Sequence, residues 1–221
     1  MFHGKHPVEA IDRTAAWVGL KLEPAQRGRL ERYAAWLGEE AIPAGGIGPQ
    51  EADRLVERHV ADALSFAVGW KRPPRTLLDV GSGVGLPGIP LAIVLPGTRV
   101  TLVDRAERRC RLARRAVRVL QLGNVEVVQR DVRHLHGRWE AVVARAVFDP
   151  AGTLDVVAPV LSDEGVAIIG LSRASHPQDL PPAPVGTVVD LLAVPAGVLD
   201  TPAWLLRMTA TRHDRPGSAL N

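Results

Sequence analysis

The fold is decided by residues 77–88, which read Leu77-Leu78-Asp79-Val80-Gly81-Ser82-Gly83-Val84-Gly85-Leu86-Pro87-Gly88. The apolar start is typical of a buried strand, and the glycines that follow let the backbone turn tightly and approach a ligand closely. Pro87 suits the first turn of a helix, so we expect a helix to begin near it. The stretch therefore predicts a strand, a glycine-rich turn and a helix, with a binding site at the turn.

Downstream of this stretch, short β-branched runs alternate with helical stretches. The runs cover residues 76–80, 99–103, 125–128, 141–144 and 166–169. This alternation predicts an α/β fold with a doubly wound, mostly parallel sheet that is covered by helices on both faces. Two further strand candidates, 187–192 and 204–208, have no clear helix between them. We therefore expect a hairpin whose last strand runs antiparallel to the others.

The N-terminal third of the chain has a helical pattern. Within residues 8–40, apolar residues recur at helical spacing, as in Leu30, Tyr33 and Leu37. A third helix is expected from about residue 49 to residue 70. We therefore expect two units, a helical cap over residues 1–70 and a ligand-binding core over residues 71–221.

Composition narrows the class of protein. Hydrophobic residues make up 46% and charged residues 23% of the chain, as in soluble globular proteins. No apolar run reaches the roughly 18 residues that a membrane-spanning helix needs, and the N-terminus lacks the apolar core of a signal peptide. The single cysteine, Cys110, excludes an internal disulfide framework, and the scattered histidines give no metal-ligand spacing. We therefore expect a cytoplasmic protein that binds neither a metal nor a membrane.

Asp104 suggests what binds at the glycine-rich turn. It ends the second predicted strand, where a carboxylate can accept hydrogen bonds from both hydroxyls of a ribose. Residues 83–88 also match the dinucleotide fingerprint G-x-G-x-x-G, with Asp104 about 20 residues further on. A nucleotide-containing cofactor is therefore expected, and a nicotinamide dinucleotide stays open at this point.

Asp79 favours a different cofactor. A carboxylate just before the first glycine would repel the pyrophosphate of a dinucleotide, because like charges repel at short range. S-adenosylmethionine (SAM) has no phosphate, and its ammonium and sulfonium groups are cationic. The order of Asp79, the glycines and Asp104 therefore predicts a SAM site, with contacts at Asp79, Gly81, Gly83, Gly85 and Asp104.

The glycine loop belongs to a longer motif, Asp79-Val-Gly-Ser-Gly-Val-Gly-Leu-Pro-Gly-Ile-Pro-Leu-Ala92, whose Leu-Pro-Gly-Ile-Pro-Leu part is more specific than the glycines. Other segments read Arg58-His59-Val-Ala-Asp62-Ala-Leu64, Asn124-Val-Glu-Val-Val-Gln129 and Val143-Ala-Arg145-Ala146. Together these motifs extend over about residues 30–165. They resemble the glucose-inhibited division protein B family, bacterial methyltransferases that modify guanine N7 in 16S ribosomal RNA.

The resemblance implies a class I SAM-dependent methyltransferase with a Rossmann-like fold, which acts as a monomer on 16S rRNA of the small ribosomal subunit. Carried over by motif, the cofactor contacts fall on Gly81, Leu86, Val132, Arg133 and Arg145. No catalytic residue is implied, and the substrate-site candidates are His59, Asp62 and Arg145. From the residues alone, a helix histidine such as His59 is more often a packing or capping residue.

The chain also departs from the family pattern. Gly170-Leu171-Ser172-Arg173 stands where the family usually has Lys-Gly, and Trp36-Leu37 and Gly46-Ile47-Gly48 stand where it usually has Trp-Asn and Asn-Leu-Thr. The missing lysine leaves open a methyltransferase of the same fold that has diverged to another RNA or a small molecule. A nucleotide-binding protein without methyl transfer is the third possibility.

Arginines crowd the predicted helix after Asp104. The chain has 3 lysines among 27 basic residues, and Arg108, Arg111, Arg115 and Arg118 form one stripe on this helix. Such a stripe can contact the phosphates of RNA, although it can equally be a solvated face, and the arginine excess fits a GC-rich genome. On the apolar face, Cys110 is expected to be a small core residue, with a reactive thiolate as the alternative.

The chemistry of guanine N7 fits a chain without a base motif. Methyl transfer is an in-line displacement, which an enzyme accelerates mainly by aligning the two reactants. N7 has a free lone pair, so no general base is needed to remove a proton. The absence of such a motif would instead count against methylation of a hydroxyl or an amine.

Overall fold

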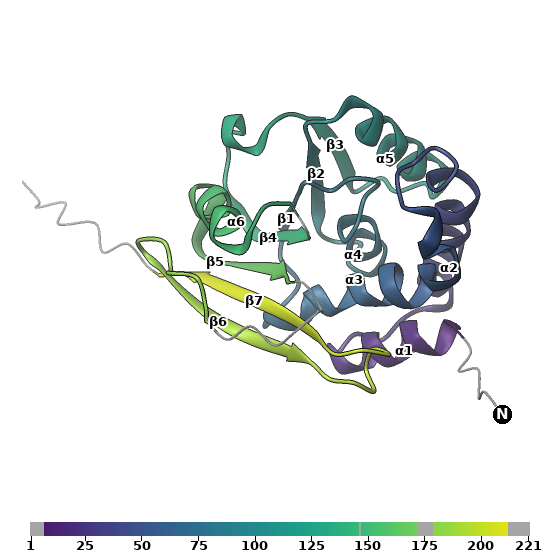
Figure 1. Cartoon of the computed structure of the whole chain (residues 1–221), viewed down its shortest axis with the longest axis horizontal. Helices are drawn as coiled ribbons and strands as arrows, with labels where there is room; N and C mark the ends of the chain where they lie inside the picture. The colour runs from purple at the N-terminus through teal and green to yellow at the C-terminus, as the bar shows by residue number, and fades with distance from the viewer. Residues whose placement is uncertain (1–6, 146, 172–178, 212–221) are drawn as a thin grey trace, which may run out of the picture.

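The structure, a computed structural model, describes residues 7–145, 147–171 and 179–211. Its centre is a seven-stranded sheet with the order β3-β2-β1-β4-β5-β7-β6 (Figure 1). The strands are β1 (Thr76–Val80), β2 (Arg99–Asp104), β3 (Val125–Gln129), β4 (Trp139–Arg145), β5 (Leu161–Gly170), β6 (Thr187–Val194) and β7 (Ala203–Ala210). All seven predicted strands are confirmed, and every strand except β1 extends beyond its predicted run.

One strand of the sheet, β7, runs opposite to the other six. Parallel pairing joins β3, β2, β1, β4 and β5, whereas β7 is antiparallel to both β5 and β6. The predicted hairpin with an antiparallel last strand is therefore confirmed. From β1 the chain first builds the sheet toward β3 and then continues on the other side with β4. Ligands of open α/β sheets bind at the carboxyl ends of the strands beside such a switch point, and the glycine loop lies there.

Neighbouring residues of β1 pack on opposite faces of the sheet, as the period of two in a strand requires. Leu77 belongs to the hydrophobic cluster that includes residues of α4 (Gly88–Val94) and α5 (Glu107–Val119). Leu78 belongs to the cluster that includes residues of α6 (Pro150–Val157). Helices on both faces, and with them the doubly wound α/β class, are confirmed. Cys110 of α5 is buried, and burial raises the pKa of its thiol, so it is the expected core residue.

The N-terminal helices are α1 (Pro7–Trp17), α2 (Pro24–Trp36) and the π-helical turn η1 (Leu37–Ala41). The single helix expected over residues 49–70 is wrong, because this segment is divided into η2 (Pro49–Arg54), η3 (Leu55–Ala61), α3 (Asp62–Ser65) and η4 (Phe66–Gly69). In the π-helical η3, Leu55 and Val60 lie five residues apart and both are buried, which suits the wider turn of a π-helix. In the part of the chain that the structure describes, no helix is long and apolar enough to cross a membrane.

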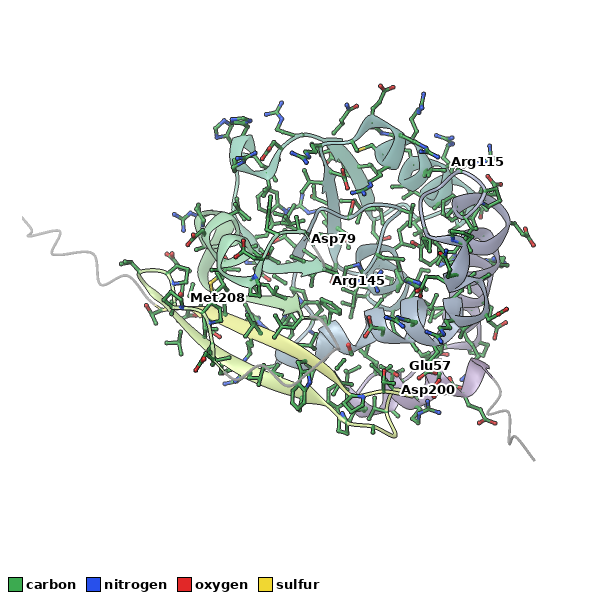
Figure 2. The ribbon with its side chains drawn as sticks, in the orientation of Figure 1. Glu57, Asp79, Arg115, Arg145, Asp200 and Met208 are labelled. Carbon is green, nitrogen blue, oxygen red and sulfur yellow. The ribbon has the colours of Figure 1, made fainter. Side chains whose placement is uncertain are left out.

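The N-terminal helices are attached to the sheet at several points. Ile11 and Leu30 share one hydrophobic cluster with Leu77. At the turn between β6 and β7, the backbone N–H of Asp200 donates to the Glu57 carboxylate at 2.7 Å, and Figure 2 shows these two residues close together beside α1. The helical region therefore packs on the same side of the sheet as α4 and α5.

Candidate functional site

The glycine loop follows β1 with a backbone conformation that glycine favours. Gly81, Gly83 and Gly85 have φ angles of +63°, +60° and +104°, which residues with a side chain rarely adopt. A Cβ on Gly81 would lie 2.7 Å from a methyl group of Val147, whereas a Cβ on Gly83 would meet nothing within 4 Å. The loop is therefore closed on the side of Val147 and open at Gly83, where a ligand can approach the backbone.

Tyr33 of α2 supports the loop from inside the molecule. Its ring is fully buried and stacks on Trp36, with ring centroids 6.0 Å apart. Its hydroxyl donates a hydrogen bond to the carbonyl oxygen of Val84 at 3.0 Å. The sequence pattern identified Tyr33 as a core residue of a helix, but helical spacing gives no sign that its hydroxyl reaches the loop.

Asp104 closes the loop from the neighbouring strand. Its Oδ2 accepts a hydrogen bond from the backbone N–H of Gly83 at 3.0 Å, and its Oδ1 accepts one from the N–H of Ala106 at 2.8 Å. A carboxylate oxygen can accept more than one hydrogen bond, so both oxygens keep acceptor capacity for ribose hydroxyls. The predicted pairing of the glycine loop with Asp104 is therefore present.

Asp79 lies deeper than the sequence argument assumed. Its side chain is fully buried, and its Oδ2 accepts a hydrogen bond from the N–H of Gly88 at the start of α4, at 2.7 Å. Burial raises the pKa of Asp79 to about 8, although the Gly88 N–H and the charge of Arg145 lower it. Asp79 is therefore mostly protonated at neutral pH. This corrects the expectation of an ionised carboxylate that repels phosphate.

A chain of polar side chains lies next to the loop at the end of β4. Arg145 donates to Asp62 Oδ2 at 3.2 Å and contacts His59 Nδ1 at 3.3 Å, and His59 Nε2 lies 3.2 Å from Glu51. Burial, and then the charge of Arg145, lower the pKa of His59 to about 4, so the ring is neutral at pH 7. Since Arg145 can only donate, Nδ1 is the acceptor and Nε2 carries the proton toward Glu51.

The three substrate-site candidates, His59, Asp62 and Arg145, are thus brought together. Figure 2 places Arg145 close to Asp79 in the centre of the molecule. Both ring nitrogens of His59 are engaged, so this histidine holds Arg145 rather than offering a free base. Both side chains of the ion pair are largely buried: Arg145 is 22% exposed and Asp62 is 10% exposed.

The remaining cofactor-site predictions lie along the same edge of the sheet. Leu86 of the glycine loop is buried, and so is Val132, at the start of η5 (Val132–His134). Arg133 is exposed, and its guanidinium donates to the Asp131 carboxylate at 2.6 Å. Its main chain belongs to the turn that follows β3. The N–H of Arg130 donates to the carbonyl oxygen of Asp104 at 3.0 Å, so this turn is tied to the end of β2.

The residues at this edge fit SAM. Within the described ranges, Asp79 Oδ1 and Ser82 Oγ are buried and have no hydrogen-bond partner, so the loop has polar atoms left over for a ligand. Asp104 adds a carboxylate, and Gly83 leaves open backbone beside it. The Asp104 carboxylate suits ribose hydroxyls, and Ser82 Oγ can accept a hydrogen bond from a cationic amine.

Part of the departure from the family pattern lies outside the described residues, namely Ser172 and Arg173. Gly170 is described and ends β5, and a Cβ there would lie 2.9 Å from the ring of Phe66 and 3.4 Å from the side chain of Arg145. Because Gly170 has no side chain, β5 can lie close to the side chain of Arg145.

Comparisons with known proteins agree with this geometry. The family profile of rRNA small subunit methyltransferase G (GidB) matches residues 26–176. The ribosomal RNA small subunit methyltransferase G of Chromohalobacter salexigens is 34% identical over 175 residues, which cover 78% of this chain and 83% of that protein. The protein of the same name from Roseiflexus castenholzii is 30% identical over 95% of this chain and 99% of its own length.

Among solved structures, coclaurine N-methyltransferase bound to N-methylheliamine and SAH superposes with a TM-score of 0.50 at 16% identity, over 74% of this chain and 56% of that one. At this identity the likeness concerns the fold alone. Together, the glycine loop, Asp104 and these matches establish that the chain belongs to the rRNA small subunit methyltransferase G family and is a SAM-dependent methyltransferase.

Proposed function

We propose that this enzyme transfers a methyl group from SAM to N7 of a guanine in 16S rRNA, as a monomer in the cytoplasm. The observation that supports this most directly is the glycine loop closed by Asp104, next to the chain formed by Arg145, Asp62 and His59. The family name of the relatives supports the rRNA of the small subunit as the substrate.

When bound, SAM supplies an electrophilic methyl group, and the lone pair of guanine N7 forms the new bond while the sulfur keeps the electrons of the broken one. The protein has no proton to remove in this reaction. That agrees with His59, which is neutral and hydrogen-bonded at both ring nitrogens. The task of the residues is therefore to hold the two reactants in line.

The cofactor-binding roles that we propose follow from position. Asp104 accepts the ribose hydroxyls, and Asp79 with the open backbone at Gly83 faces the amino acid part. Arg145, fixed by Asp62 and His59, orients the cofactor carboxylate or a phosphate. The main chain of Gly81, Leu86, Val132 and Arg133, together with the turn at Gly85, completes the site.

Phe148 is the aromatic side chain that we propose for the target base. It is 44% exposed, and it directly follows Val147, which lies against Gly81. The next residue, Asp149, caps α6 through a 2.9 Å hydrogen bond from the N–H of Gly152, so the backbone beside Phe148 is fixed. Methylation at N7 leaves a positive charge on the purine, which the face of an aromatic ring stabilises.

We also propose that residues 1–70 act as a cap and residues 71–221 as the SAM-binding core. The hydrogen bond from Tyr33 to Val84 supports a cap that holds the cofactor loop in place.

A second candidate is a methyltransferase of the same fold that modifies another RNA or a small molecule. The sequence Gly170-Leu171 in place of the family's usual Lys-Gly favours it. Incubation with methyl-labelled SAM and either 30S subunits, protein-free 16S rRNA or a panel of small molecules separates the two. We expect label in the ribosomal substrates, and label in small molecules alone would favour the second candidate.

A further inference from the structure

We infer that α5 and the loop before η2 form a groove that binds the phosphate backbone of the RNA substrate, beside the cofactor loop. This inference rests on the proposed function, because it assigns a contact surface for the same RNA. A cavity of about 400 Å³ lies at this place. Five arginines of α5 line it: Arg108, Arg111, Arg114, Arg115 and Arg118.

The arginines of this phosphate groove are incompletely neutralised. Arg115 is paired with Glu40 at 2.7 Å, and Arg111 lies 3.8 Å from Glu107. The carboxylates paired with the five guanidinium groups, as far as the described residues go, are these two, which leaves a surplus of three positive charges. Arg108 and Arg118 have no ion-pair partner within residues 7–145, 147–171 and 179–211.

The ion pairs show which arginines of the predicted stripe are available to bind phosphate. Arg111 and Arg115 are paired with acids, and Arg114 donates a hydrogen bond to the carbonyl oxygen of Val127 at 3.2 Å. The two arginines best able to bind an external anion are therefore Arg108 and Arg118. Successive arginines of the stripe lie three or four residues apart, so their charges repel each other, and a bound anion relieves that repulsion. A guanidinium group also matches phosphate oxygens with paired hydrogen bonds, which favours a phosphodiester over other anions.

The segment at Gly46 lies between the phosphate groove and the cofactor loop. A Cβ on Gly46 would lie 2.5 Å from a methyl group of Val84 in the glycine loop and 3.1 Å from Leu112, which lines the groove. The segment at Gly46 therefore separates the two sites by the width of one backbone.

The loop before η2 also contributes to the groove, which Ala44 lines. A Cβ on Gly45, whose φ is +65°, would lie 2.7 Å from the guanidinium of Arg108. Arg108 is the second residue of α5, four residues after Asp104 at the end of β2. Figure 2 shows Arg115 at the outer side of the molecule, away from Asp79 and Arg145. An RNA strand that starts at Arg115 and follows α5 toward Arg108 therefore leads to the cofactor edge of the sheet.

The test compares two double variants with the same loss of charge. In the first, Arg108→Gln and Arg118→Gln remove the two unpaired arginines of the phosphate groove. In the second, Arg72→Gln and Arg99→Gln remove two exposed arginines at the opposite edge of the sheet, before β1 and at the start of β2. Binding of 16S rRNA is measured by filter binding over a range of KCl concentrations, and SAM affinity is measured by calorimetry.

For the groove variant we expect RNA affinity to fall roughly tenfold or more at low salt, and the slope of log K against log salt to decrease by about 0.7–0.9 for each lost contact. SAM affinity and the melting temperature should stay as in the wild type, and the control variant should bind RNA with the wild-type slope. Unchanged RNA binding by the groove variant, or an equal loss in both variants, would overturn the groove.

A failure of the proposed function gives a different result. In that case the wild type transfers no methyl group to 16S rRNA, whatever the arginine variants do. Competition by inorganic phosphate without any change in RNA binding would show an adventitious anion site, and it would likewise overturn the inference.

Discussion

Asp104 accepts a hydrogen bond from the backbone N–H of Gly83 in the glycine loop and another from the N–H of Ala106, just before α5. Replacement by alanine removes these bonds and the ribose contact together. We expect Asp104→Ala to weaken SAM binding by about 1.5–3 kcal/mol, since hydrogen bonds to a charged group are worth about that much. Calorimetry measures the change, and Asp163→Ala, which removes an exposed carboxylate on β5, is the control. Wild-type affinity in a folded Asp104→Ala variant would show that the ribose lies elsewhere.

The raised pKa of Asp79 makes the folded protein less stable as the pH rises, the reverse of the usual effect of a carboxylic acid. Its pKa is about 8 in the folded chain, because of burial, and about 4 in an unfolded one. Between these values the folded state binds more protons, so the contribution of Asp79 to the free energy of unfolding is full below about pH 4 and is lost as the pH rises through about 8.

Asp79→Asn does not titrate, so the stability of the wild type relative to this variant should fall between about pH 5 and about pH 8. Urea unfolding at a series of pH values measures this difference, in which His59 and the other titrating groups cancel. A difference that does not change with pH would mean that Asp79 stays ionised in the folded protein.

Phe148 allows a test of base recognition that leaves the cofactor site intact. Stacking of a base on an aromatic ring is worth about 1–3 kcal/mol. Phe148→Ala should therefore lower kcat/KM for the RNA by roughly 5- to 150-fold, while Phe148→Trp retains most of it and both variants keep wild-type affinity for SAM. Equal activity of the alanine variant would remove Phe148 from the substrate site.

At the scale of elements, α2 acts on the cofactor loop through one hydrogen bond. Tyr33→Phe keeps the ring that stacks on Trp36 but leaves the carbonyl oxygen of Val84 without its donor. We expect a loss of about 0.5–1.5 kcal/mol in the free energy of unfolding, together with weaker SAM binding. Urea unfolding and calorimetry measure the two effects. If stability falls while SAM affinity is unchanged, the hydrogen bond serves packing alone and the cap has no part in the cofactor site.

The elements differ in how well their sequences predict them. Strands such as β1 are predictable because a short apolar run between turn residues is too short for a buried helix. The runs also alternate with helical stretches, as they do in an α/β fold. Residues 49–70 were predicted as one helix, since apolar spacing does not separate an α turn from the π turn that buries Leu55 and Val60. The burial of Asp79 is equally invisible in sequence, because it depends on where α4 begins.

At the scale of the whole molecule, the topology explains why residues distant in sequence meet. β1, β2 and β4 are parallel neighbours, so the loop after β1, Asp104 and Arg145 all lie at one edge of the sheet. The sequence motifs identify the glycine loop and Asp104 as one cofactor site, and His59, Asp62 and Arg145 as substrate-site candidates. The contact of Gly46 with both Val84 and Leu112 was not predictable, because nothing local in the sequence ties the loop after η1 to α5.

The identity of the methylated atom is the most direct test of the account. The 16S rRNA is incubated with the enzyme and methyl-labelled SAM, digested to nucleosides, and separated by chromatography with mass detection. We predict that the label appears in 7-methylguanosine, with Asp104→Ala giving little or none at the same SAM concentration. Label in a different nucleoside, or none in the RNA from an enzyme that binds SAM, would contradict the proposed function.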